Sequence, residues 1–131
     1  MADCLFCKIA KKEIPGYLIY EDKEAMAFLD IFPASKAQTL VIPKKHYSYI
    51  FDMPDKEYSS LLLKSKKIAK AIDKAFSTVR TSVVIEGFAV DHVHIRLHPC
   101  YERRLSLKPM RNKPSEEELQ NQVKKIKTLL K

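Results

Sequence analysis

Hydrophobic residues in the first part of the chain form short runs with the length and spacing of β-strands. Three apolar runs, each bounded by proline, lysine or acidic residues, predict strands at 17–20, 25–29 and 39–42. From Asp55, the expected N-cap, the apolar positions recur at helical spacing and predict one long helix. They share one face, and lysines fill the other; the apolar positions are Leu61, Ile68, Ile72 and Phe76.

The second half of the chain repeats this order. Strands are predicted at 82–86 and 93–97. Ser115 and Glu118 then have the spacing of a capping box, which predicts the start of a short amphipathic C-terminal helix. The pattern is met most simply by an α+β fold, in which the two helices pack on one side of an antiparallel sheet of about five strands.

Size and composition indicate one globular domain over 1–131. We divide it into a core at 1–108 and a basic linker with the C-terminal helix at 109–131. No apolar run is long enough to cross a bilayer, and the first residues resemble neither a secretory signal nor a transit peptide. We therefore expect a cytoplasmic protein, or a nuclear one, with no membrane partner. The net charge of +8 favours an anionic partner without choosing among nucleotides, nucleic acid and a membrane surface.

Glycine and cysteine usage narrows the candidate chemistry. Gly16 and Gly87 are the only glycines, so the sequence contains no glycine-rich phosphate loop. A phosphate site must then be built from side chains, and Gly87 is the candidate for a close backbone approach. The three cysteines, two of them spaced as Cys4-x-x-Cys7, argue against a disulfide framework. A metal half-site, a redox pair and plain buried thiols all remain open.

The most informative segment is Asp91–Pro99, which holds three of the four histidines and alternates with period two. On a strand, Val93, Ile95 and Leu97 would face the core, while the polar residues face the other way: His92, His94, Arg96 and His98. A neutral imidazole is a nucleophile near pH 7, and arginine is a fixed cation for phosphate oxygens. The grouping favours phosphoryl chemistry over a chance set of half-buried histidines.

This segment resembles the signature of the histidine triad (HIT) family, His-φ-His-φ-His-φ-φ, with φ apolar and proline often following. Counted back from Pro99, His92 and His94 match the first two histidines, and Arg96 stands in place of the third. The N-terminal half is similar to that of bacterial-type and Hint-like members at four segments: Cys4–Ile9, Glu13–Pro15, Ala27–Ile31 and Thr39–His46. The resemblance runs from Cys4 to Pro99.

The resemblance implies a HIT-like fold, a two-fold homodimer, and hydrolysis or transfer at the α-phosphate of a purine nucleotide conjugate. The substrate would be a phosphoramidate, a dinucleoside polyphosphate or an adenylate, and no catalytic metal would be required. His94 would be the nucleophile that forms a covalent nucleotidyl-histidine, with His92 and Arg96 as the other catalytic positions. The implied nucleotide-binding residues are Phe6, Ile9, Phe28, Asp30, Ile31, Gly87 and Arg96, with Asp30 on the ribose hydroxyls and the apolar residues around the base.

The same resemblance implies a structural zinc ion. Its ligands would be Cys4, Cys7, His46 and His92, a closed tetrahedral set that holds the N-terminus to the sheet.

Departures from the family pattern keep other functions open. Arg96 replaces the third histidine, and His98 stands where a hydrophobic residue is usual. A catalytically weak or inactive nucleotide-binding protein with a regulatory role is therefore the alternative to the enzyme. The basic run over 103–113 is more typical of a solvated or dimer-contacting tail, and nucleic-acid binding is the third, least favoured function.

Overall fold

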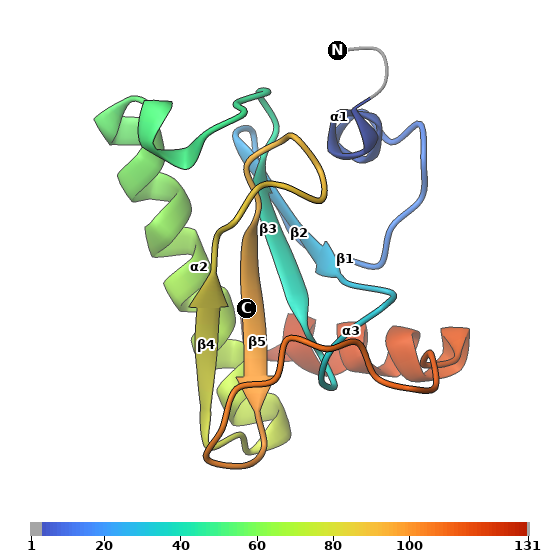
Figure 1. The fold of residues 1–131 in the computed structure, drawn as a ribbon. Coiled ribbons are helices and arrows are strands. Elements are labelled where there is room, and N and C mark those ends of the chain that lie inside the picture. Colours follow the sequence, from blue (N-terminus) through green and yellow to red (C-terminus); the bar gives the residue numbers. More distant parts are fainter. Residues whose placement is uncertain (1–3, 131) are drawn as a thin grey trace.

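The computed structural model describes residues 4–130, which form one five-stranded sheet with helices packed against it (Figure 1). The order in the sheet is β1-β2-β3-β5-β4, and every neighbouring pair is antiparallel. The strands are β1 (Leu18–Glu21), β2 (Ala25–Leu29), β3 (Thr39–Pro43), β4 (Arg80–Val84) and β5 (Ile95–Cys100). The predicted α+β class, with five antiparallel strands, is confirmed.

Two long helices, α2 (Asp55–Phe76) and α3 (Glu116–Leu130), share a single core with one face of the sheet. The apolar faces predicted for them are buried there, including Leu61, Ile68 and Ile72. Sequence reasoning missed the six-residue helix α1 (Leu5–Ala10) and the 3₁₀ turn Ile50–Asp52. Among the described residues, no helix has both the length and the apolar character that crossing a membrane requires.

The central strands β2 and β3 are buried along their whole length because both faces of the sheet are covered. Ala27 and Val41 belong to the core under the helices. On the opposite face Met26, Phe28, Leu40 and Ile42 form a second apolar cluster with Phe6 of α1. The N-terminal segment therefore covers the face that the long helices leave open.

The two predicted helix starts have different outcomes. Ser115 Oγ accepts a hydrogen bond from the Glu118 N–H at 3.1 Å, which confirms this capping interaction at the start of α3. The predicted N-cap of α2 was wrong by one residue: Pro54 is the N-cap, and Asp55 is the first helical residue. Proline fits this position because no backbone N–H is needed before the first turn.

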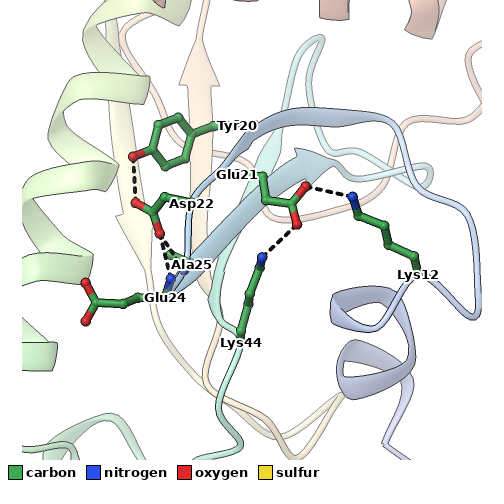
Figure 2. Close-up of polar contacts among 7 residues, drawn as sticks. All are labelled: Lys12, Tyr20, Glu21, Asp22, Glu24, Ala25 and Lys44. Atoms are coloured by element: carbon green, nitrogen blue, oxygen red, sulfur yellow. Dashed lines mark hydrogen bonds and ion pairs between the residues drawn. The ribbon is translucent and has the colours of Figure 1, made fainter.

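A carboxylate closes the turn between β1 and β2 (Figure 2). Asp22 accepts hydrogen bonds from the Tyr20 hydroxyl at 2.6 Å and from the backbone N–H groups of Glu24 and Ala25. Lys64 of α2 lies 2.9 Å away. Burial alone would raise the pKa of Asp22, but the bonds from Lys64, the hydroxyl and the two N–H groups outweigh it and lower the pKa well below its usual range.

Glu21 joins two further segments next to this turn. Its two carboxylate oxygens bind Lys12, just after α1, at 3.0 Å and Lys44, just after β3, at 2.6 Å (Figure 2). The chain that leaves α1 is thereby held to the sheet beside the second apolar cluster.

Candidate functional site

Strand β5 positions the histidine-rich segment, although it begins later than predicted. The strand starts at Ile95, so His92 and His94 lie just before it, His92 in a bend of the chain. The predicted alternation holds: Val93, Ile95 and Leu97 are at most 2% exposed in the core under the helices. His94 and Arg96 line a cavity on the other face of the sheet.

The orientation of the His94 ring is fixed by a backbone carbonyl. His94 Nδ1 lies 2.7 Å from the His92 carbonyl oxygen. A carbonyl can only accept a hydrogen bond, so Nδ1 carries the proton and Nε2 keeps its lone pair in the neutral ring. The ring is 3% exposed and packs edge-on against Phe6, with 5.0 Å between ring centroids. The direction of the Nε2 lone pair is therefore fixed, and this nitrogen is shielded from bulk water.

The cavity beside His94 has a volume of about 540 Å³ and a mainly apolar wall. That size is within the range of small-molecule sites. Phe6 and Phe28 contact each other edge-to-face in this wall, with centroids 5.7 Å apart. Of the residues assigned to nucleotide binding, the structure brings together six around this cavity: Phe6, Ile9, Phe28, Asp30, Ile31 and Arg96.

Asp30 lies at the polar side of the cavity and is held by two donors. Its Oδ1 accepts the Phe32 N–H at 2.8 Å, and its Oδ2 accepts the side-chain amide of Gln38 at 2.9 Å. Gln38 is itself 2% exposed and accepts the Ala34 N–H at 2.6 Å. Each Asp30 oxygen retains a lone pair, so the carboxylate can accept further hydrogen bonds from a ligand's hydroxyl groups.

Gly87 is not among the residues that line the cavity; its neighbours Glu86 and Ala89 are. The glycine has φ +70°, a backbone conformation that other residues rarely adopt. A Cβ added there would meet only the Ser48 carbonyl, at an ordinary 3.7 Å. What requires glycine here is thus the turn itself, which returns the chain toward Glu86.

Four side chains from three separate segments converge at the end of the sheet near α1. The potential ligand atoms of Cys4, Cys7, His46 and His92 all lie within 4.8 Å of one another. His92 Nδ1 is 3.3 Å from Cys4 Sγ and 3.5 Å from Cys7 Sγ, and His46 Nδ1 is 3.4 Å from Cys7 Sγ. In a tetrahedral zinc site the sulfur and nitrogen ligands are about 3.5 Å apart, so these separations fit such an ion.

Protonation in this cluster also fits a metal. His92 Nε2 lies 2.8 Å from the Pro43 carbonyl, which can only accept, so Nδ1 presents its lone pair to the two sulfur atoms. Burial lowers the pKa of His92, which keeps the ring neutral, as a ligand must be. The second nitrogen bound to a carbonyl is the usual support of a metal-binding imidazole. His92 does not line the cavity, and its link to the site is the carbonyl that orients His94.

His98, two residues after Arg96 in β5, is buried without using its polar atoms. The ring is 1% exposed, and neither nitrogen has a hydrogen-bond partner within residues 4–130. Burial lowers its pKa, so the ring is neutral at physiological pH. It therefore occupies its position as an apolar residue would.

Among the residues of the site that sequence reasoning missed, four stand out for their contacts or their place in the chain. Gln38 supports Asp30, Glu86 lies against His94 and Arg96, and the cavity wall includes Leu107 and Pro109 from the segment between β5 and α3. A polar residue next to Gly87 was a local signal for Glu86. The other three residues carry no local signal, because their roles arise from contacts distant in sequence.

A family model described as the HIT domain matches residues 11–102. The chain is 41% identical over 103 residues to an uncharacterized HIT-like protein of Methanocaldococcus jannaschii, which covers 76% of this chain and 80% of that protein. It is 36% identical over 107 residues to an adenosine 5′-monophosphoramidase of Saccharomyces cerevisiae, a match that covers 81% of this chain and 68% of that protein.

The fold agrees with these similarities. The crystal structure of a Hit-like protein involved in cell-cycle regulation from Bartonella henselae matches with a TM-score of 0.85 at 30% identity, over 98% of this chain and 97% of that one.

Proposed function

Because the chain belongs to the HIT domain family, we propose that it hydrolyses or transfers nucleotides at the α-phosphate, with His94 as the nucleophile. The supporting observation is the directed Nε2 of His94 on the wall of a cavity that also contains Asp30 and Arg96. A purine base would occupy the apolar part of the cavity, and the ribose hydroxyls would donate to Asp30. The similarity to a yeast adenosine 5′-monophosphoramidase supports a nucleoside phosphoramidate as the substrate.

The reaction would proceed in two displacements at phosphorus. The Nε2 lone pair of His94 attacks the α-phosphorus, a P–N bond to the imidazole forms, and the bond to the leaving group breaks as that group takes up a proton. Water then attacks the same phosphorus, and the P–N bond to the ring breaks. The nucleoside monophosphate leaves with the oxygen of that water, and one proton of the water passes to the solvent. Arg96, a fixed cation in the cavity wall, would stabilise negative charge on the phosphate oxygens in both steps.

Rapid quenching with a labelled adenosine phosphoramidate tests this proposal. The wild type is expected to give an acid-labile, base-stable nucleotidyl-protein and free AMP. His94→Ala should lose the adduct completely and at least about 10³-fold of the turnover, while His98→Phe, a change at a buried histidine outside the cavity that makes no hydrogen bond, should retain both.

The alternative function is nucleotide binding with little or no turnover. It is supported by Arg96 in the third triad position and by the Glu86 carboxylate that lies against it, 3.7 Å from Arg96 Nη1. Binding of AMP by a wild type that forms neither the adduct nor free AMP would establish this alternative and refute the enzyme.

We also propose that Cys4, Cys7, His46 and His92 hold a structural zinc ion, on the strength of their donor set and spacing. The ion would fix the N-terminal segment, and with it Phe6, against the sheet. The covalent step itself needs only the chain's own residues.

A two-fold dimer is proposed as the assembly. β4 is an edge strand within the described sheet, and its Val83 is 52% exposed. Pairing of two β4 edges would satisfy the unpaired backbone groups of that edge and cover this side chain. Among the described residues no cysteine forms a disulfide, and the buried Cys100 stays a thiol, which fits a reducing compartment such as the cytoplasm or nucleus.

A further inference from the structure

The carboxylate of Glu86 lies among the groups that would receive a phosphate. Its Oε1 is 3.5 Å from His94 Nε2 and 3.7 Å from Arg96 Nη1. Its Oε2 accepts the backbone N–H of Phe88 at 2.6 Å. These groups come from three different positions and lie around one carboxylate.

The Gly87 turn brings this carboxylate into place. With φ +70° at Gly87, the chain reverses, and the Phe88 N–H points back at the side chain two residues earlier. Burial alone would raise the pKa of Glu86. The backbone N–H groups of Phe88 and Ala89 and the Arg96 guanidinium outweigh burial and lower that pKa, so the side chain is an anion at neutral pH.

The contact is incomplete from the carboxylate's side. Glu86 Oε1 is buried, yet among residues 4–130 no group makes a hydrogen bond to it. A buried charged oxygen without a hydrogen bond is unfavourable, and the one cation near this oxygen, Arg96, is at 3.7 Å too far away to form a strong ion pair with it. A phosphate oxygen with better geometry would displace it or would have to bind directly beside it.

We propose that Glu86 is a specificity-determining residue that makes the site discriminate between singly and doubly charged α-phosphates. This inference rests on the proposed function. A free nucleoside monophosphate carries almost two negative charges near pH 7.5, because the second proton of a phosphate monoester dissociates near pH 6. An α-phosphate joined to an amine or to an ester carries one.

The carboxylate repels the doubly charged group more strongly and competes with it for the same donors. The conjugate is therefore retained, and the monophosphate produced by hydrolysis is expelled. Glu86 thus selects substrate over product by charge, in a site where the positive charge of Arg96 would otherwise favour the product.

Glu86→Gln is the direct test, because glutamine keeps an acceptor for the Phe88 N–H and removes the charge. Calorimetric titrations at pH 7.5 would use AMP, its singly charged methyl ester and adenosine, with the guanosine series in parallel. We expect affinity for the monophosphate to rise about tenfold or more, affinity for the methyl ester to rise by less than about threefold, and affinity for the nucleoside to stay unchanged.

Glu102→Gln is the matched control, since Glu102 is an exposed carboxylate outside the cavity and its loss changes the net charge by the same amount. It should alter none of the three affinities. Glu86→Ala provides a second variant if the glutamine side chain distorts the turn, and it should also raise the affinity for AMP over that for the ester.

An unchanged ratio of monophosphate to ester affinity in both Glu86 variants, or weaker AMP binding, would overturn the inference while leaving the proposed function standing. If no nucleoside or nucleotide of either series binds the wild type or the variants, the proposed function fails, and the inference fails with it.

Discussion

Replacing Ile126 with alanine tests whether the C-terminal helix belongs to the same cooperative core as the active-site sheet. Ile126 of α3 is 0% exposed and packs in the core shared with Ile19 of β1 and Ile72 of α2. The helix also anchors the segment after β5, from which Leu107 and Pro109 line the cavity. Its attachment therefore bears on the site as well as on stability.

The expected loss follows from the buried volume. Removing the side chain beyond Cβ at a fully buried isoleucine costs about 2–5 kcal/mol, and we take about 3 because helix α3 lies at the edge of the core and can partly close the gap. A chain of 131 residues has an unfolding entropy of about 0.28 kcal/mol/K near 60 °C. Ile126→Ala should then lower Tm by about 11 °C.

Differential scanning calorimetry measures this change in Tm for Ile126→Ala and for a control variant on the same helix. Leu129 is 37% exposed, so Leu129→Ala should cost less than about 0.5 kcal/mol and shift Tm by no more than about 2 °C. AMP affinity at 15 °C should be the same in both, because the fold is intact there. Equal Tm values for the two variants, with α3 melting in a separate early transition, would refute the shared core and make 109–131 an appended unit.

Three further results are expected. Purified wild type should carry about one zinc ion per chain, measured by plasma emission spectroscopy. Cys7→Ser should lose the ion and unfold at a lower temperature, whereas Cys100→Ser, which changes a buried thiol outside the cluster, should keep it. Wild type purified without metal would contradict the site. Because hydrogen bonds lower the folded-state pKa of Asp22, its stabilisation is present above the unfolded pKa of about 4 and is lost as pH falls below it. Asp22→Asn should therefore be less stable than wild type by roughly 1 kcal/mol at pH 7, and urea titrations should show the difference shrinking toward pH 3; a constant difference would be evidence against the assigned charge. Arg96→His should raise phosphoramidate turnover, because histidine restores the third triad position and can still donate to the phosphate; a fall in kcat would show that the fixed charge of Arg96 contributes more than the third histidine would.

Local pattern was sufficient for most of the fold. Runs of apolar residues located all five strands to within three residues, most closely β2 and β3, which are buried on both faces. Helical spacing located α2 and α3 because each presents one apolar stripe to the core. The short helix α1 gives too brief a pattern for periodicity to detect, and it is held by contacts with the sheet rather than by its own propensity.

The site was predictable where it depends on side-chain type and was not where it depends on distant contacts. The alternation around His94 gave its face correctly, yet β5 begins at Ile95 because the preceding residues are held by other bonds, such as that of the Val93 N–H to the Tyr47 carbonyl. Gln38 reaches Asp30 across a loop, eight residues away in sequence. Such a hydrogen bond has no periodicity to reveal it.

His92 connects the metal cluster to the nucleophile through two different parts of one residue. Its ring faces the sulfur atoms of Cys4 and Cys7, and its carbonyl accepts the hydrogen bond from His94 Nδ1–H that fixes the tautomer of His94. A metal bound by that ring would hold the backbone at this residue, and the carbonyl with it, in one position. The cluster can therefore affect the reaction without contacting the nucleotide: loss of the metal would let the His92 carbonyl move and leave Nε2 of His94 less precisely aimed. Under the proposed function, a structural ion and the covalent step would therefore depend on the same residue.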